Sequence, residues 1–292
     1  MHVFNISTIL QACFHMNKSF LSLIVIAMIA TGCTTTKSIQ YPAKGSNTTI
    51  SVSSEQISAM TESGGGDHFI EGSQITVGDA SNALSNPASN AFGLIGVGVA
   101  TAIDKRNNGA AISNSNLKQA IKFDEIVNKK ISSALQENQA DTSLKLMTSN
   151  QASDVKIVPF ARLSFKEKPD VKAVFGLKAE FKNAADNNKS AKRLYNYISQ
   201  KKAPLTEWDA NNNTVFFTQA NKAFDALAQV LVLDIQHQLN LEAASEVDQK
   251  KCKSTGDFSG ITFISAPENL CVGVLKTNKG VVLPNFVLVI EQ

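Results

Sequence analysis

The sequence has few of the side chains that most often carry out chemistry. Its 292 residues include four histidines, four cysteines, three tyrosines and one tryptophan. It contains no H-E-x-x-H pattern of zinc peptidases, no C-x-x-C pair and no G-x-S-x-G nucleophile turn. Only His68 and His237 lie after residue 33. The sequence therefore predicts no catalytic residue, no metal site and no cofactor.

A strong charge of either sign and a long apolar run are also missing. Lysine and arginine number 28, aspartate and glutamate number 25, and the formal net charge is +3 at pH 7. A balance so close to neutral does not favour nucleic acid as a partner. The apolar run Phe20–Ala30 is shorter than the roughly 20 residues that a membrane-spanning helix needs.

What the sequence does contain is a secretory signal over Met16–Cys33. Lys18 supplies the cationic start, Phe20–Ala30 is the apolar core, and residues 30–32 are all small, as a cleavage site requires. The order and the lengths of these parts fit a segment that is removed on export. The sequence therefore predicts a secreted or envelope protein.

The last four residues of this segment, Ala-Thr-Gly-Cys, resemble the lipobox of bacterial lipoproteins. In that family the cysteine sulfur receives a diacylglyceryl group and the new amino terminus is acylated. The resemblance implies that Cys33 carries enough hydrocarbon, palmitate included, for lasting attachment to a membrane. Thr34 stands where a retention signal would have aspartate. This implies sorting to the outer membrane of a Gram-negative cell, with the domain facing the periplasm.

These features divide the chain into five parts. Residues 1–15 form an upstream extension, with Met16 rather than Met1 as the candidate initiator, and residues 16–32 are the signal peptide. Residues 33–49 hold the lipidated cysteine and a flexible tether rich in Ser, Thr and Lys. Residues 50–250 are predicted to form a periplasmic α/β domain, and residues 251–292 a β-rich C-terminal region.

Two cysteines, Cys252 and Cys271, remain after Cys33. In an oxidising compartment such a pair is typical of a disulfide. Closing a loop of about 20 residues would contribute roughly 3 kcal/mol by restricting the unfolded chain. We therefore predict that a Cys252–Cys271 disulfide ties the C-terminal region.

An apolar, glycine-rich segment over residues 91–104 ends abruptly at charged residues. It is too short to span a bilayer. One interpretation is a buried helix whose small residues allow close packing. The other is a contact with a partner or a membrane, made through the large apolar side chains Phe92, Leu94, Ile95, Val97 and Val99.

Periodicity predicts the secondary structure of the rest. Strands are predicted over Thr49–Ser53, Phe69–Val77, Asp154–Phe165, Val171–Phe181 and three stretches after residue 257. Helices are predicted over Asn116–Asn138 and Thr214–Leu241. Loops or connectors are predicted over Thr142–Ser153 and Asp186–Lys189. The fold class expected is α+β, with an antiparallel sheet packed with helices and a small disulfide-tied C-terminal region.

Several polar residues are candidates for a binding or catalytic site. Asp67 and His68 follow three glycines, and we interpret them as exposed residues of a turn rather than an acid–base pair, because neighbours on an extended chain point to opposite faces. The lysines of Val171–Phe181 are interpreted as a solvated face of a strand. Tyr195 and Trp208 fit either an interface or the rim of a core.

The order of elements is loosely similar to auxiliary lipoproteins of envelope transport systems. The resemblance implies a non-catalytic binding or assembly component of the cell envelope, attached by its lipid, with an envelope protein as partner and no nucleic acid. Two alternatives stay open. One is an envelope-polymer hydrolase that uses paired carboxylates, which need no local motif. The other is a carrier of a small hydrophobic ligand.

Overall fold

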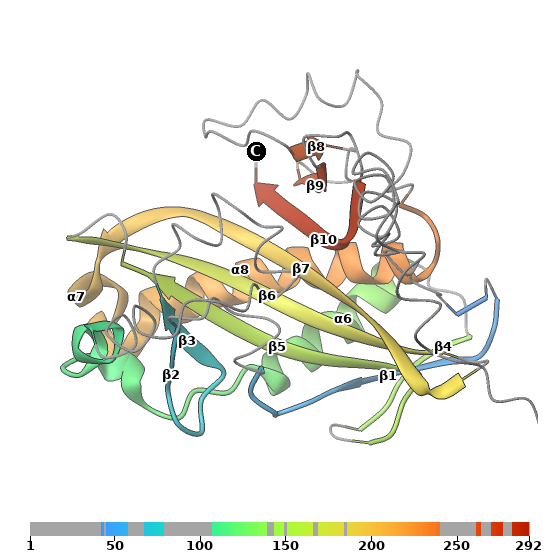
Figure 1. The fold of residues 1–292 in the computed structure, drawn as a ribbon, viewed down its shortest axis with the longest axis horizontal. Helices are drawn as coiled ribbons and strands as arrows, with labels where there is room; N and C mark the ends of the chain where they lie inside the picture. The colour runs from blue at the N-terminus through green and yellow to red at the C-terminus, as the bar shows by residue number, and fades with distance from the viewer. Residues whose placement is uncertain are drawn as a thin grey trace, which may run out of the picture. The chain divides into compact units, whose positions relative to one another are not determined.

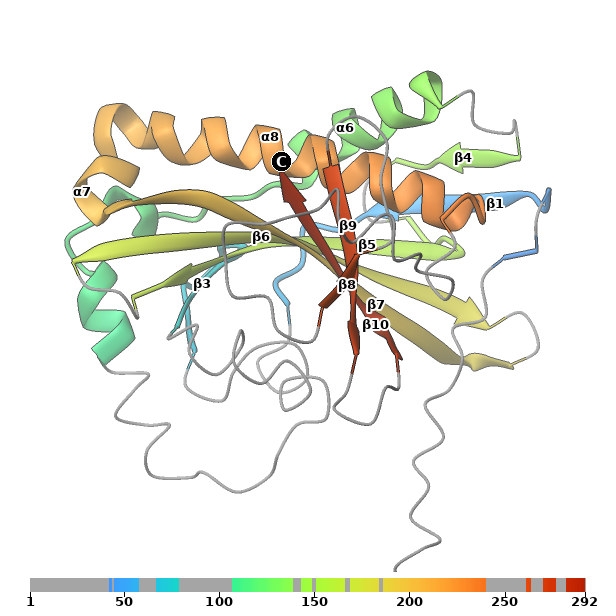
Figure 2. The ribbon, with the colours of Figure 1, turned by 90° about the horizontal axis from the view of Figure 1, so that it is seen from above.

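A computed structural model describes residues 42–43, 45–57, 67–78, 107–138, 143–148, 151–165, 169–183, 186–239, 261–263, 270–276 and 282–291. Within these ranges the chain is a mixed α+β domain built on one ten-stranded sheet. The two long helices lie together on one face of the sheet (Figures 1 and 2). The predicted signal, Cys33, the 91–104 segment and Cys252 lie outside the described residues.

The main path of the sheet runs β2-β3-β5-β6-β7-β10-β9-β8, and β1 pairs with both β4 and β5. The strands are β1 (Thr48–Val52), β2 (His68–Phe69), β3 (Ile75–Gly78), β4 (Leu144–Leu146), β5 (Val155–Ser164), β6 (Asp170–Asn183), β7 (Asp186–Pro204), β8 (Ile261–Phe263), β9 (Leu270–Lys276) and β10 (Val282–Glu291).

The expected antiparallel sheet is in fact mixed. Among the described strands β1 runs parallel to β4 and β5, β3 runs parallel to β5, and β10 runs parallel to β7. Parallel neighbours need crossover connections, and α6 and α8 provide two of them. The α+β class is confirmed, while the purely antiparallel arrangement is wrong.

The centre of the sheet is the β5–β6 hairpin that the alternating pattern predicts. Val155 to Ser164 pairs without a break with Phe181 to Lys172. The next strand, β7, continues from Asp186 to Pro204, so the loop predicted over Asp186–Lys189 is wrong. Its apolar residues are sparse and its charges many, which is why the pattern alone does not reveal it.

Two short strands share one flank of β5. β1 pairs with Val155–Ile157 and β3 pairs further along with Ala161–Ser164. Pro159 lies between these two pairings, where its missing N–H leaves no ladder bond unmade. With β1 and β3 on one side and β7 beyond β6 on the other, the hairpin has no open edge over most of its length. Within the described residues a partner strand therefore has no free edge of this hairpin to pair with over that length.

Helices α6 (Asp124–Glu137) and α8 (Ala210–Ile235) cover the sheet, and α7 (Leu205–Trp208) precedes α8. Residues 107–112 are α-helical, and η2 (Asn116–Lys118) is a short 3-10 helix. Only the second half of the predicted 116–138 helix is α-helical. Three asparagines, Asn211–Asn213, have positive φ between α7 and the regular part of α8. The regular part of the helix therefore begins next to Thr214, where the predicted helix starts.

Aromatic rings fill the space between helices and sheet. Phe175 of β6 contacts Phe216 and Phe224 of α8, and Phe123 at the start of α6 contacts the same two rings. Trp208 is fully buried and its indole N–H donates to the carbonyl of Val171 at 3.0 Å. Of the two interpretations open from the sequence, Trp208 therefore belongs to the core.

The C-terminal strands are confirmed as strands but belong to the main sheet. β10 pairs with β9 and also, through Phe286–Val289, with β7. They are therefore closing strands of the main sheet and share its core. Cys271 in β9 is buried and disulfide-bonded. None of the other three cysteines lies in a described range, so its pairing with Cys252 stays a prediction.

Candidate functional site

A row of charged side chains crosses the sheet on the face opposite the helices. Lys156 of β5 lies opposite Glu180 of β6, and Glu180 lies opposite Lys192 of β7. On each strand the residues next to these in sequence, such as Ile157 and Ala179, point to the core below α6 and α8. Lys156, Glu180 and Lys192, called the charged rung from here on, thus place plus, minus and plus charges side by side on three neighbouring strands.

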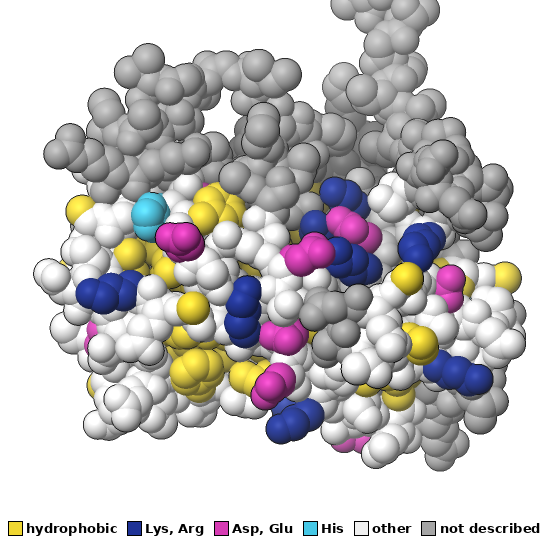
Figure 3. Space-filling model, turned by 90° about the horizontal axis from the view of Figure 1, so that it is seen from below, with side chains coloured by type: hydrophobic (Ala, Val, Ile, Leu, Met, Phe, Trp, Pro, Cys, Tyr) yellow, Lys and Arg dark blue, Asp and Glu magenta, His cyan; other side chains and the backbone are white. Residues whose placement is uncertain are grey.

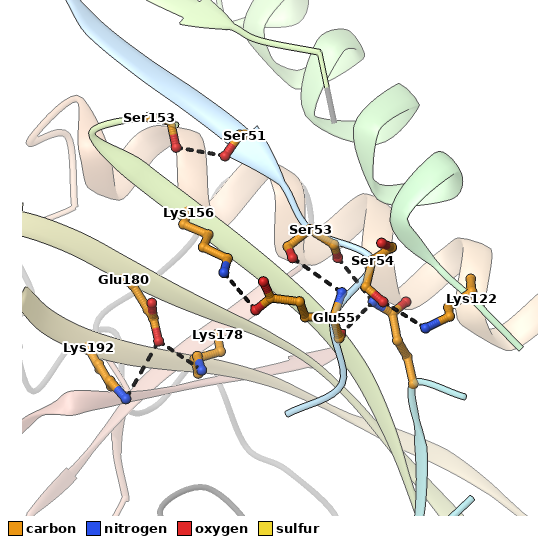
Figure 4. A network of polar contacts seen from close by, with 11 residues as sticks. Ser51, Ser53, Ser54, Glu55, Lys122, Ser153, Lys156, Lys178, Glu180 and Lys192 are labelled. Carbon is orange, nitrogen blue, oxygen red and sulfur yellow. Dashed lines mark hydrogen bonds and ion pairs between the residues drawn. The ribbon is translucent and has the colours of Figure 1, made fainter. Parts of the chain in front are cut away.

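Two further residues complete the charged group (Figure 4). Lys178, two residues before Glu180 on the same strand, donates to Glu180 Oε1 at 2.8 Å, and Lys192 Nζ lies 3.5 Å from the same oxygen. Lys156 Nζ contacts Glu55 Oε2 at 2.6 Å. Charges therefore alternate in sign across the group from Glu55 to Lys192.

Lys178 departs from the solvated face that its strand pattern predicts. Its side chain is only 8% exposed. Val158 and Leu194 lie opposite it on the two neighbouring strands, so its stem packs among apolar groups while its ammonium reaches Glu180. Lys192, by contrast, is 46% exposed. The charged rung therefore has accessible ends at Lys156 and Lys192 and is supported beside its centre by the buried Lys178.

The pKa of Glu180 reflects this setting. Burial raises it, but the hydrogen bond and charge of Lys178, with the charges of Lys192 and Lys156, lower it by more, and the pKa of Glu180 lies below its ordinary value of 4.5. Glu180 is therefore ionised at neutral pH. Its negative charge offsets the repulsion among the ammonium groups of Lys156, Lys178 and Lys192.

The backbone beneath Glu55 is fixed by Gln74, which is fully buried in the turn before β3. The amide nitrogen of Gln74 donates to the carbonyls of Ser53 and Glu55, both at 3.0 Å. Its oxygen accepts from the N–H of Phe123 at 2.6 Å. One side chain thus joins the segment after β1 to the start of α6, and it holds Glu55 on a rigid support.

An apolar cluster lies next to the charged rung on the same face. Ile57, Val158 and Phe160 are buried together, and the partly buried Phe69 and Leu194 pack against them. Leu194 is two residues beyond Lys192 on β7, so apolar and charged side chains adjoin directly. Figure 3 shows basic and acidic side chains in mixed groups among hydrophobic ones on the side seen from below.

Asp67 is not the exposed turn residue that the sequence predicts. Its carboxylate is 2% exposed and accepts from Arg162 of β5 at 2.7 Å. Gly78 makes room for this ion pair, because a Cβ there would lie 2.0 Å from Asp67 Oδ1. The sequence feature that indicates this buried ion pair is Arg162, a cation among the apolar residues of a central strand, rather than the three glycines before Asp67.

A second buried ion pair joins α8 to β7. Asp234 Oδ2 accepts from Arg193 Nη1 and from the hydroxyl of Tyr195, both at 2.5 Å. Burial raises the pKa of Asp234, and the charge of Arg193 offsets only part of this effect. Burial also raises the pKa of Tyr195 well above 10, so its hydroxyl stays protonated and donates.

The arrangement supports binding better than bond cleavage. The two buried carboxylates of the described residues, Asp67 and Asp234, each bind an arginine rather than a second carboxylate. No group of three potential metal ligands occurs in the described ranges, and no helix there is long and apolar enough to cross a bilayer. His68 is half-buried in β2, and His237 is exposed after α8.

No family model matches the chain, and a search of curated proteins finds no significantly similar sequence.

Proposed function

We propose that this protein is a lipid-anchored lipoprotein of the bacterial envelope whose domain binds another envelope protein through the face that carries the charged rung. The observation that carries the proposal is the alternation of charge from Glu55 to Lys192 on a rigid sheet. Charges of fixed position and alternating sign favour one partner in one register, more than they add raw affinity.

The surroundings of the rung support a protein as the partner. Protein interfaces combine an apolar centre with a polar rim. The partly buried Phe69 and Leu194, which pack on the buried Ile57, Val158 and Phe160, supply apolar surface beside the rung. A polyanion would select a surface of one sign, whereas here Glu55 and Glu180 stand among the lysines. The mixed charge therefore favours a folded partner with its own alternating charges.

Binding is favoured over hydrolysis for a geometric reason. Paired-acid hydrolysis needs two carboxyl groups facing each other across a cleft. In the described residues the carboxylates of Asp67, Asp234 and Glu180 all contact cations. These carboxylates are therefore engaged in ion pairs and do not face a second carboxylate.

The anchor rests on Cys33 and the signal before it. Cys33→Ser should abolish palmitate labelling and release the protein from membranes, because it removes the sulfur that carries the lipid. Retention of both label and membrane attachment would refute the anchor. The Cys252–Cys271 disulfide belongs to the same proposal, since it needs an oxidising compartment; peptide mapping without reductant should recover the two cysteines in one linked peptide.

The binding surface is tested by photo-crosslinking in intact cells. A photoreactive amino acid replaces Lys192, at an exposed end of the rung, or Thr218, an exposed residue of α8 on the opposite side. We expect a discrete crosslinked partner from position 192 and none from position 218, and we expect Lys156→Glu to weaken the crosslink. Equal crosslinking from both positions, or none from 192, would refute this surface.

The apolar segment with Phe92, Leu94, Ile95, Val97 and Val99 is proposed as a second contact, because its composition is unusual for a solvent-exposed stretch. Deleting residues 91–104 should reduce recovery of the partner while the unfolding transition of the domain stays cooperative. Unchanged recovery with an intact fold would remove this segment from the proposal.

A further inference from the structure

The end of α8 contains a backbone conformation that its residue does not favour. His237 has φ of +57°, in the left-handed region. Its N–H donates to the carbonyl of Asp234, and the N–H of Gln238 donates to that of Leu233. This pair of bonds is the Schellman motif, whose left-handed position is usually glycine because a Cβ is strained there. A histidine at this position calls for a reason.

The reason lies in the contact of the His237 side chain. Its Nε2 lies 3.0 Å from the carbonyl oxygen of Pro42, a residue nearly two hundred positions earlier. Since the carbonyl can only accept, Nε2 carries the proton and donates. Ala43 then accepts from Ser46, which also contacts Thr48 at the start of β1. The chain is therefore held to the domain from Pro42 onward, several residues before the sheet begins.

This contact lies at one particular end of the domain. Thr49, Asp154 and Lys182 are joined there, by bonds from Thr49 to the Asp154 carboxylate and from the Lys182 N–H to the Asp154 carbonyl. Figures 1 and 2 show the start of β1, the strand β4 and the C-terminal end of α8 together, with α7 at the opposite end. We call the first the anchored end and the second the distal end. Asp170, paired with Pro204, marks the distal end, about 40 Å from Lys182 along β6 at the usual rise per residue.

The length of the chain before Pro42 limits how the domain can sit. From Cys33 to Pro42 a fully extended chain reaches about 30 Å, whereas from Cys33 to Thr48 it would reach about 50 Å. Holding Pro42 therefore removes much of the slack that the tether would otherwise have. If Cys33 is held at a membrane, this reach would keep the anchored end within about 30 Å of it.

We infer that the His237–Pro42 contact is a clamp that turns the anchored end of the domain toward the lipid bilayer and presents the distal end to the periplasm. This inference rests on the proposed lipidation of Cys33. His237 is then a positioning residue, and its side-chain contact is made although its backbone has an unfavourable positive φ. Glycine would suit the backbone better but could not hold Pro42.

Energy transfer to a membrane tests the orientation. The mature lipoprotein is reconstituted in phosphatidylcholine vesicles whose headgroups carry an acceptor dye, with a fluorescent amino acid in place of either Lys182 or Thr206, which lies exposed on α7. We expect stronger transfer from position 182 than from position 206. In His237→Gly the ratio of the two should fall but stay above one, because the chain then leaves the domain near Thr48, still at the anchored end, with a reach of about 50 Å instead of about 30 Å. The fold should stay intact because the backbone strain is relieved. Gln238→Ala, a change in the exposed neighbour, should leave the ratio as it is.

The outcomes separate the clamp from the anchor. Equal transfer from both positions in the unaltered protein, or a ratio that His237→Gly does not change, would overturn the clamp while leaving the lipid anchor in place. If the protein carries no palmitate and does not attach to the vesicles, the lipid anchor is refuted, and the proposed orientation with it.

Discussion

Arg193 and Asp234 form an ion pair of 2.5 Å in which each side chain is 3% exposed. The pair connects β7 with the last turn of α8, where the negative end of the helix dipole disfavours a carboxylate. Arg193 supplies the compensating charge, and Tyr195 the second hydrogen bond. The position of α8 on the sheet thus depends on a polar contact as well as on apolar packing.

Removing one partner of this pair should be costly. Arg193→Met leaves the Asp234 charge buried without its cation, and we expect the free energy of unfolding to fall by about 3–5 kcal/mol. Denaturant unfolding followed by circular dichroism measures this change. The double variant Arg193→Met/Asp234→Leu removes both charges and should regain a large part of the loss; a double variant as unstable as the sum of two singles would contradict this account.

Gln74 offers a second test, at the junction of β1, β3 and α6. Gln74→Leu keeps the volume but removes three hydrogen bonds and leaves the backbone groups of Ser53, Glu55 and Phe123 unsatisfied. We expect a loss of about 2–4 kcal/mol in the free energy of unfolding. Gln56→Leu is the matched control, because that half-buried side chain makes one bond, to the Ile70 carbonyl at 2.8 Å. Equal losses for the two variants would show that Gln74 is not a junction.

Gly78 tests the space around the Asp67–Arg162 pair. In Gly78→Ala the new methyl group would overlap the Asp67 carboxylate, so either the ion pair breaks or β3 shifts. We expect destabilisation of about 3 kcal/mol or more, the scale of a broken buried pair. In an Asp67→Ser background the added methyl group should cost much less. Additive effects in this double-mutant cycle would contradict the proposed overlap.

Acid should weaken the domain through Glu180 and Asp154. The pKa of Asp154 is also lowered, because the Thr49 hydroxyl and N–H and the charge of Lys182 outweigh the raising effect of burial. Both carboxylates bind protons less readily in the folded state, so the unfolded chain takes up more protons as the pH falls. Their contribution to stability is complete above the unfolded-state pKa values, near 4.5 for Glu180 and 3.8 for Asp154. It is lost as the pH falls through the lower pKa values of the folded state.

This pH dependence is measured by thermal unfolding between pH 7 and pH 3. Glu180→Gln should flatten the curve below pH 4.5, because it removes one of the two groups. Asp234 works in the opposite sense. Its raised pKa means that protonation favours the folded state, so it does not contribute to the acid loss. A Glu180→Gln curve parallel to that of the unaltered protein would refute the assignment.

The local sequence pattern is sufficient to predict helices and strands that have one apolar and one polar face. The β5–β6 hairpin, α8 and the three C-terminal strands all show alternating or helical spacing in the sequence, and all are present. β4 is missed because its three residues are too few to show an alternating pattern, and most of β7 is missed because its residues are largely polar. β7 pairs with β6 and β10, and Asp234 satisfies the polar ends of its buried Arg193 and Tyr195. No local pattern encodes such partners.

The candidate site is harder to read from the sequence than the fold. Lys178 and Glu180 alternate with apolar residues, and this pattern is typical of a solvated face. Their proximity to Lys156 and Lys192 depends on the register of three strands, which becomes visible only once the sheet is assembled. His237 is similar: it is exposed, but its contact with Pro42 joins distant parts of the chain.

The position of β5 in the chain affects how this protein can be made. β1 and β3 join the central hairpin only through β5, with Thr49 and Asp154 separated by 105 residues and Thr76 and Ala161 by 85. Pairing over such separations is slow, since the loop must close before any contact forms. If the chain is exported from its N-terminus, as its signal predicts, more than half of it must cross before β1 and β3 can join β5. In that case the late position of β5 would delay assembly of the central sheet until most of the chain had been translocated.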